Sequence, residues 1–164
     1  MNFQVIPISV GEFGMVRDDI KYYGGSPDIK KYVPSYIYLI QGEGEQYLVD
    51  TGFPDPEFCS LILQLDVKRE IPFADLFQKY KIKAERVKGI FFTHLHWDHC
   101  GNINIFPNAK LYLQSKEYMA AQSKSSYPPV FLEDLRQACE SRDRLVLLDG
   151  DSEPVPGICV HLCG

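Results

Sequence analysis

The residue types that can do chemistry gather in one short stretch of this chain. Residues 91–100 read FFTHLHWDHC and hold three of the protein's four histidines, with an aspartate, within six residues. The four potential ligands are His94, His96, Asp98 and His99. Imidazole and carboxylate groups together suit zinc, and iron or manganese accept the same ligands. The alternative, that these histidines only pack and cap a strand end, is disfavoured by so many ligands in so few residues.

The spacing of the four residues predicts a site with two metal ions. In an extended segment alternate side chains point the same way, with their Cα atoms roughly 6.6 Å apart, so two imidazoles at this spacing can converge on one ion. Four ligands are more than a single tetrahedral catalytic ion takes from one short loop. We therefore expect His94 and His96 on one ion, and Asp98 and His99 on the other. Such ions share a bridging hydroxide that attacks at neutral pH, because metals lower the pKa of bound water from about 15.7 toward 7.

Apolar runs around the cluster predict the elements that position it. The continuous apolar run 87–93 predicts a buried strand that leads into the cluster, and the Gly-Asn pair that follows allows the bend that His99 needs. Residues 35–41 and 45–50 flank a Gly-Glu-Gly turn and predict a hairpin. Further strands are predicted over 3–10, 110–114, 145–148 and 158–162, and helices over 56–65, 72–80, 115–122 and 131–140.

The whole pattern predicts a mixed α/β fold in one domain. Strands and helices alternate along 164 residues, a length that fits a single domain, and 45% of the residues are apolar, which argues against disorder. Residues 11–34 are rich in glycine and tyrosine and lack periodicity, so they predict a long loop. Tyr22 and Tyr23 in this loop belong either to a lid over a lipophilic substrate or to an ordinary surface loop.

The charge and the cysteines limit the class of partner. A net charge of −5 disfavours nucleic acid, because phosphate binding requires clusters of Lys and Arg. The chain has neither the long apolar stretch of a membrane span nor the start of a signal peptide. Its five cysteines are scattered without a CxxC pair, which indicates a cytoplasmic protein with reduced thiols. We expect a small molecule as the main partner.

Other candidate ligands are expected to have packing roles. Trp97 and Cys100 lie inside the cluster, but a bulky indole between ligands and a small side chain at a tight bend both favour packing. Cys159 and Cys163 fall on one face of a predicted strand. A metal or redox role is open for them, and burial in the core is the favoured interpretation.

The sequence HLHWDH has the HxHxDH signature of the metallo-β-lactamase superfamily, and the resemblance covers nearly the whole chain. Residues 36–52 resemble the family's first hairpin, which ends in Asp-Thr-Gly, and residues 89–102 resemble its strand and metal loop. The run FPNAKLYLQSKEY, at 106–118, resembles N-acyl homoserine lactonases in particular. The last residues, 150–164, resemble the approach to the family's next metal motif.

This resemblance implies an αββα sandwich of which the chain supplies mainly the first βα half. Residues 1–164 would form a single domain that ends just before the family's third ligand histidine. His94 and His96 would hold the first metal, and Asp98 and His99 the second. Asp98 would also orient the nucleophile or manage protons. Asp50 matches the hairpin aspartate that hydrogen-bonds to a ligand histidine and fixes its tautomer.

The resemblance implies a metal-dependent hydrolase of a small ester-like substrate. Lactone opening by a metal-bridged hydroxide is the favoured version, with two divalent ions, zinc first and iron or manganese as alternatives. A glyoxalase II-like thioesterase uses the same metal loop and is the alternative enzyme. A non-catalytic or split subunit that keeps the loop is the alternative of another class, and a second polypeptide or self-association would then complete the fold. The substrate-binding residues stay undetermined.

Overall fold

The computed structural model describes residues 2–122, 133, 135–137 and 143–163. Within them a sheet of seven strands has the order β4-β1-β2-β3-β5-β6-β7, and β8 and β9 form a separate hairpin. The strands are β1 (Gln4–Arg17), β2 (Lys30–Gly42), β3 (Glu45–Val49), β4 (Val67–Lys68), β5 (Val87–Phe91), β6 (Lys110–Gln114), β7 (Leu145–Leu148), β8 (Ser152–Val155) and β9 (Ile158–Val160). The helices are α1 (Asp18–Lys21), α2 (Pro56–Leu61), α3 (Phe73–Tyr80), α4 (Trp97–Cys100) and α5 (Ser115–Gln122), with 3-10 turns at Ala84–Arg86 and Ile103–Ile105.

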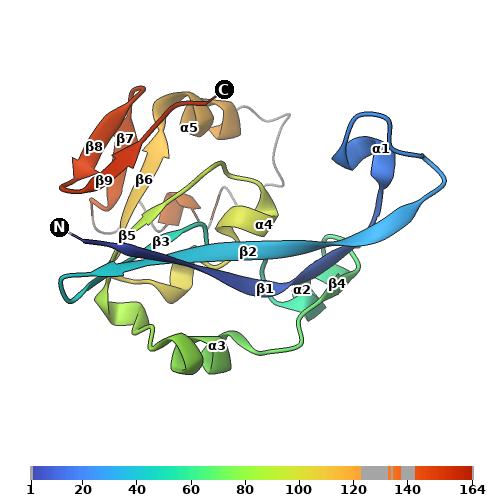
Figure 1. Cartoon of the computed structure of the whole chain (residues 1–164), viewed down its shortest axis with the longest axis horizontal. Coiled ribbons are helices and arrows are strands. Elements are labelled where there is room, and N and C mark those ends of the chain that lie inside the picture. Colours follow the sequence, from blue (N-terminus) through green and yellow to red (C-terminus); the bar gives the residue numbers. More distant parts are fainter. Residues whose placement is uncertain (1, 123–132, 134, 138–142, 164) are drawn as a thin grey trace.

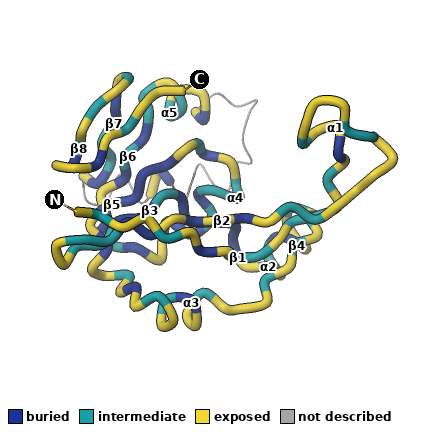
Figure 2. The backbone as a smooth tube through the Cα atoms, viewed as in Figure 1, coloured by how far each residue is buried: buried dark blue, intermediate teal, exposed yellow. Residues whose placement is uncertain are grey.

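The predicted mixed α/β architecture is confirmed, with a different layer on each face of the sheet. One face carries the main core, where strand residues such as Ile8 and Leu48 pack against Leu76 of α3 and Ala121 of α5. The other face carries a smaller core, in which Phe91 packs with Ile158 of the β8–β9 hairpin and with its neighbours. In Figure 1, α3 and this hairpin lie on opposite sides of the central strands. Figure 2 shows that burial is concentrated in those central strands.

The hairpin predicted around the Gly-Glu-Gly turn is confirmed as β2–β3. Its strands pair antiparallel from Tyr38 with Val49 to Gly42 with Glu45. The turn residues Glu43 and Gly44 both have positive φ, at 53° and 80°, as a two-residue hairpin of the favoured type requires. The strand predicted at 87–93 is also present and ends at Phe91, two residues early.

The long loop predicted over residues 11–34 is wrong. β1 continues to Arg17 and β2 begins at Lys30, so the two strands form a long arm with α1 at its tip, which stands away from the body in Figure 1. The register of β1 and β2 shifts twice, between Ser9 and Gly11 and between Phe13 and Val16. Each shift moves the following side chains to the other face, so the alternation that marks a strand is broken in the sequence.

Most of the helix predicted over 131–140 lies outside the described residues. The helix predicted over 56–65 is shorter, because α2 ends at Leu61. Of the helices that the structure describes, none is long and apolar enough to cross a membrane.

The pairing of β3 with β5 positions the chemistry. These two strands are parallel neighbours, with Val49 opposite Phe91. The segments that follow them, beginning at Asp50 and at Phe92, therefore leave the sheet at the same edge. The backbone N–H of Asp50 donates to the carbonyl oxygen of Phe91 at 3.0 Å, which ties the two exits together.

Candidate metal centre

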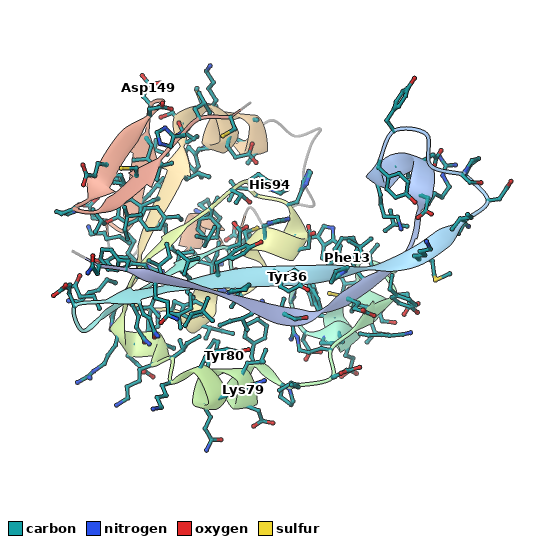
Figure 3. The ribbon with its side chains drawn as sticks, viewed as in Figure 1. Phe13, Tyr36, Lys79, Tyr80, His94 and Asp149 are labelled. Atoms are coloured by element: carbon teal, nitrogen blue, oxygen red, sulfur yellow. The ribbon has the colours of Figure 1, made fainter. Side chains whose placement is uncertain are left out.

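The histidine loop leaves the end of β5 and turns into the short helix α4. Figure 3 shows His94 on this loop, beside α4 and above the central strands. The bend comes from α4 itself, in which the N–H groups of His99 and Cys100 both donate to the carbonyl oxygen of His96. Gly101 has φ −67°, an ordinary helical value, so the bend does not depend on its conformational freedom.

The first pair of predicted ligands, His94 and His96, faces one point. The Nε2 atom of His94 lies 2.9 Å from the Nδ1 atom of His96. Two nitrogens bound to one tetrahedral zinc at 2.0–2.1 Å lie about 3.3 Å apart, so a small separation of the rings would admit an ion. Burial, followed by the charges of His99 and His96, lowers the pKa of His94, which favours the neutral imidazole that a metal requires.

The second pair, Asp98 and His99, also faces one point. The Oδ2 atom of Asp98 lies 3.5 Å from the Nε2 atom of His99. This separation is close to that of an oxygen and a nitrogen that share one tetrahedral ion. Burial alone would raise the pKa of Asp98, but the hydrogen bond and the charge of His99 outweigh it and lower the pKa, so the carboxylate form is favoured.

Asp50 supports the second pair through the ring nitrogen of His99 that faces away from Asp98. Its side chain is buried, and its Oδ2 atom lies 2.8 Å from the Nδ1 atom of His99. Asp50 also accepts hydrogen bonds from the backbone N–H and the hydroxyl group of Thr93, each at 2.8 Å. Burial lowers the pKa of His99, but the hydrogen bonds with Asp50 and Asp98 outweigh this and raise it to about 9. A carboxylate on the far nitrogen is the usual support of a metal-binding histidine.

The donor set therefore fits two ions, each with two ligands from this chain. The four nitrogen and oxygen donors are of the types that zinc, iron and manganese accept. In residues 2–122, 133, 135–137 and 143–163, no group of three or more His, Cys, Asp or Glu side chains is placed to hold one ion. The rings of His94 and His99 also lie 4.0 Å apart, so the two ligand pairs adjoin each other in one cluster.

A family model described as the metallo-beta-lactamase superfamily matches residues 31–155. The chain belongs to this superfamily. Among curated relatives, the N-acyl homoserine lactonase of Bacillus cereus is 27% identical over 136 residues, which make up 77% of this chain and 52% of the relative. A lactonase of Bacillus thuringiensis is 24% identical over the same length. The chain spans about half the length of these relatives.

Solved structures show the same fold. A quorum-quenching N-acyl homoserine lactone lactonase superposes with a TM-score of 0.75 at 23% identity, and the match covers 97% of this chain and 62% of that one. A probable metal-dependent hydrolase from Staphylococcus aureus gives a TM-score of 0.67 at 22% identity, with 96% and 62% covered. The metallo-beta-lactamase fold predicted from the sequence is therefore confirmed.

The packing roles predicted for Trp97 and Cys100 are confirmed. The indole ring of Trp97 lies 5.5 Å from the ring of Phe13, edge to face, and 6.4 Å from the ring of Phe53. Cys100 is buried, and its thiol lies 3.3 Å from the carbonyl oxygen of Leu95. Both residues hold α4 against the core of the superfamily fold.

The core position favoured for Cys159 and Cys163 is wrong, because both are exposed. β9 belongs to the β8–β9 hairpin, and only one face of this hairpin packs on the large sheet. Ile158 faces the sheet and is buried, and Cys159 faces the opposite side. Short strands of this kind show no alternation long enough to assign their faces from sequence.

Two residues near the centre had no clear signal in the sequence. Thr93 bridges Asp50 to the first pair, because its hydroxyl oxygen also lies 3.0 Å from the Nδ1 atom of His94. Its place directly before the first histidine is the only hint. Arg69 lies far away in sequence, yet its guanidinium donates to the carbonyl oxygens of Phe53 and Pro54, at 2.5 and 3.1 Å. It thereby supports the turn that follows Asp50.

Proposed function

We propose that this chain forms the metal-binding part of a hydrolase that opens a small ester-like substrate, a lactone in the first instance. The observation that carries the proposal is the pair of convergent ligand sets, one of which is supported by the buried carboxylate of Asp50. The superfamily is one of metal-dependent hydrolases, and its relatives among lactonases favour the lactone. Because the chain covers only about half of those relatives, the activity of the whole protein is part of the proposal.

The residues of the chain divide the work between holding ions and handling protons. When bound, divalent ions polarise a carbonyl group and lower the pKa of a coordinated water. Asp50 binds Nδ1 of His99, so Nε2 is the nitrogen that would lose its proton and hold the ion. Asp98, held as a carboxylate, is also able to orient a water molecule and to accept its proton. His94, whose pKa is lowered by burial, presents a neutral imidazole to the other ion, which His96 would share.

The test joins metal content with substrate choice. The chain is loaded with zinc, its bound metal is counted by native mass spectrometry, and its hydrolysis of an N-acyl homoserine lactone and of a glutathione thioester is measured. We expect two bound ions and lactone opening that is lost in His96→Ala. Hydrolysis of the thioester alone would replace the lactonase proposal with a thioesterase. Bound zinc without turnover of either substrate would overturn the proposed activity for this chain.

A further inference from the structure

The side chain of Asn102 gathers the carbonyl groups of the turn that follows Asp50. Its Nδ2 atom donates to the carbonyl oxygens of Thr51 at 2.8 Å, Gly52 at 3.2 Å and Phe53 at 2.7 Å. An amide group has two hydrogens, so the three acceptors share them. Asn102 is only 9% exposed, and its donors are therefore committed to this turn and not to water.

Backbone hydrogen bonds join the same two segments. The N–H of Thr51 donates to the carbonyl oxygen of His99 at 2.6 Å, and the Thr51 hydroxyl donates to the same oxygen at 3.1 Å. The hydroxyl in turn accepts from the N–H of Asn102 at 3.2 Å. The N–H of Gly101 donates to the carbonyl oxygen of Gly52 at 3.0 Å. The end of α4 is thus bonded along its length to the turn after β3.

Gly101 allows this close approach. A Cβ atom at this position would lie 2.4 Å from Cδ and 2.6 Å from the backbone nitrogen of Pro54, distances that real Cβ atoms do not show. Because its φ is an ordinary −67°, the absence of a side chain is needed for space and not for conformation. Any other residue would push the metal loop away from the turn.

We propose that Gly101 and Asn102 form a latch that sets the distance between Asp50 and His99. Asp50 lies directly before Thr51 and has φ +60°, outside the regular strand, so the rest of β3 does not fix its side chain. His99 is the residue whose carbonyl the latch binds. Asn102 is therefore a positioning residue for the second ligand pair. Its relevance to catalysis rests on the proposed function, whereas its effect on the Asp50–His99 hydrogen bond does not.

The test measures that hydrogen bond directly in the metal-free chain. The Hδ1 proton of His99, assigned by its absence in His99→Gln, is followed by NMR in Asn102→Asp, which keeps the shape of the side chain but removes both of its donors. Asn108→Asp is the matched control, because Asn108 also donates its Nδ2 hydrogen to a backbone carbonyl, that of Glu85, at an exposed site. Zinc affinity is measured in the same variants by competition with a chelator.

We expect Asn102→Asp to lose the slowly exchanging His99 signal and to bind zinc about 10–100-fold more weakly, with the control unchanged. A folded Asn102→Asp that keeps both the signal and the zinc affinity would overturn the latch. If this variant does not fold, Thr51→Val removes the bridging hydroxyl and is expected to give the same loss, which Thr51→Ser restores. An unaltered Thr51→Val would then overturn it. Absence of lactone hydrolysis in the wild type would count against the proposed function alone.

Discussion

The two ligand pairs of the metal centre are supported in different ways. His99 is held by Asp50, a residue 49 positions away in the sequence, and its loop is bonded to the turn after β3. His94 and His96 contact each other, and His94 also contacts the adjacent Thr93. The side chain of His99 is 27% exposed, whereas His96 belongs to the exposed class. His99 is therefore bonded directly to the buried Asp50 at the end of β3, whereas His94 is linked to Asp50 only through Thr93 and His96 is exposed.

This difference suggests that residues of the two pairs contribute differently to stability. A substitution in the second pair is expected to weaken both metal binding and the folded state, and a substitution in the first pair is expected to weaken mainly metal binding. A residue of the second pair contributes to both, because Asp50 and the latch connect it to the sheet. In the first pair, the exposed His96 is expected to contribute mainly to metal binding. Substitutions that compare the pairs can therefore break or sharpen this distinction.

The largest effect is expected for His99→Ala compared with His96→Ala. Loss of His99 leaves the buried carboxylate of Asp50 without one hydrogen-bond partner, which costs about 1.5–3 kcal/mol of unfolding free energy. Loss of His96 is expected to change stability by at most about 0.5 kcal/mol, as is usual for an exposed side chain. Urea unfolding of the metal-free chains measures both. Equal destabilisation by the two substitutions would erase the contrast between the pairs.

The next effect is expected for Gly101→Ala. The added methyl group meets Pro54, and such overpacking costs about 1–3 kcal/mol. Thermal unfolding measures the loss, and Gly101→Ala combined with Pro54→Ala is expected to recover part of it, because the ring carbon Cδ is then absent. Purely additive losses in this double-mutant cycle would show that the two segments are not in the close contact described.

A somewhat smaller effect is expected when Asp50 loses only its charge. Asp50→Asn tolerates the positive φ, so the backbone is retained. The weaker support of His99 is expected to reduce zinc affinity about 10-fold, at the lower end of the range for such partners. Isothermal titration with zinc gives the value, with Asp55→Asn as a control, because Asp55 caps α2 through the N–H of Glu57. Unchanged affinity would mean that Asp50 serves the fold alone.

The most gradual effect is expected in the pH dependence of the metal-free chain. The pKa of His99 is raised from 6.5 to about 9 in the folded state. Its contribution to stability is therefore complete below pH 6.5 and is lost as the pH rises toward 9, at no more than about 1.4 kcal/mol per pH unit. Urea unfolding between pH 6 and pH 9.5 measures the slope. His99→Gln is expected to flatten it, and a slope that persists would assign the titration to another group.

The parts of this molecule that follow from local chemistry could be predicted from its sequence. The ligand cluster is evident because its residues are rare types at close spacing, and the β2–β3 hairpin is evident because Glu43 and Gly44 form its turn. The apolar run of β5 marks the strand that carries the loop. In each case the residues that indicate the element are also the residues that form it, or lie within a few positions of it.

The parts that depend on distant contacts could not be predicted. The latch is made by the amide of Asn102 and carbonyl groups about 50 positions away, and a carbonyl group is present at every residue. The extension of β1 and β2 was hidden by the two register shifts. The outward position of Cys159 depends on which side of a small hairpin meets the sheet. None of these relations leaves a periodic pattern in the sequence.

The parallel pairing of β3 with β5 has a consequence for how such chains can vary over evolution. The segment between the two strands, with α2, β4 and α3, begins at the Asp50 turn and ends at the start of β5, at the opposite end of that strand from the ligands. One tie of this segment to the centre is the guanidinium of Arg69, which is bonded to the turn carbonyls. An insertion in the exposed stretch after α2, near Leu61 and Ile62, would therefore lengthen the chain without moving a ligand. The ligand loop and the Asp50 turn could therefore keep their geometry while that exposed stretch changes in length.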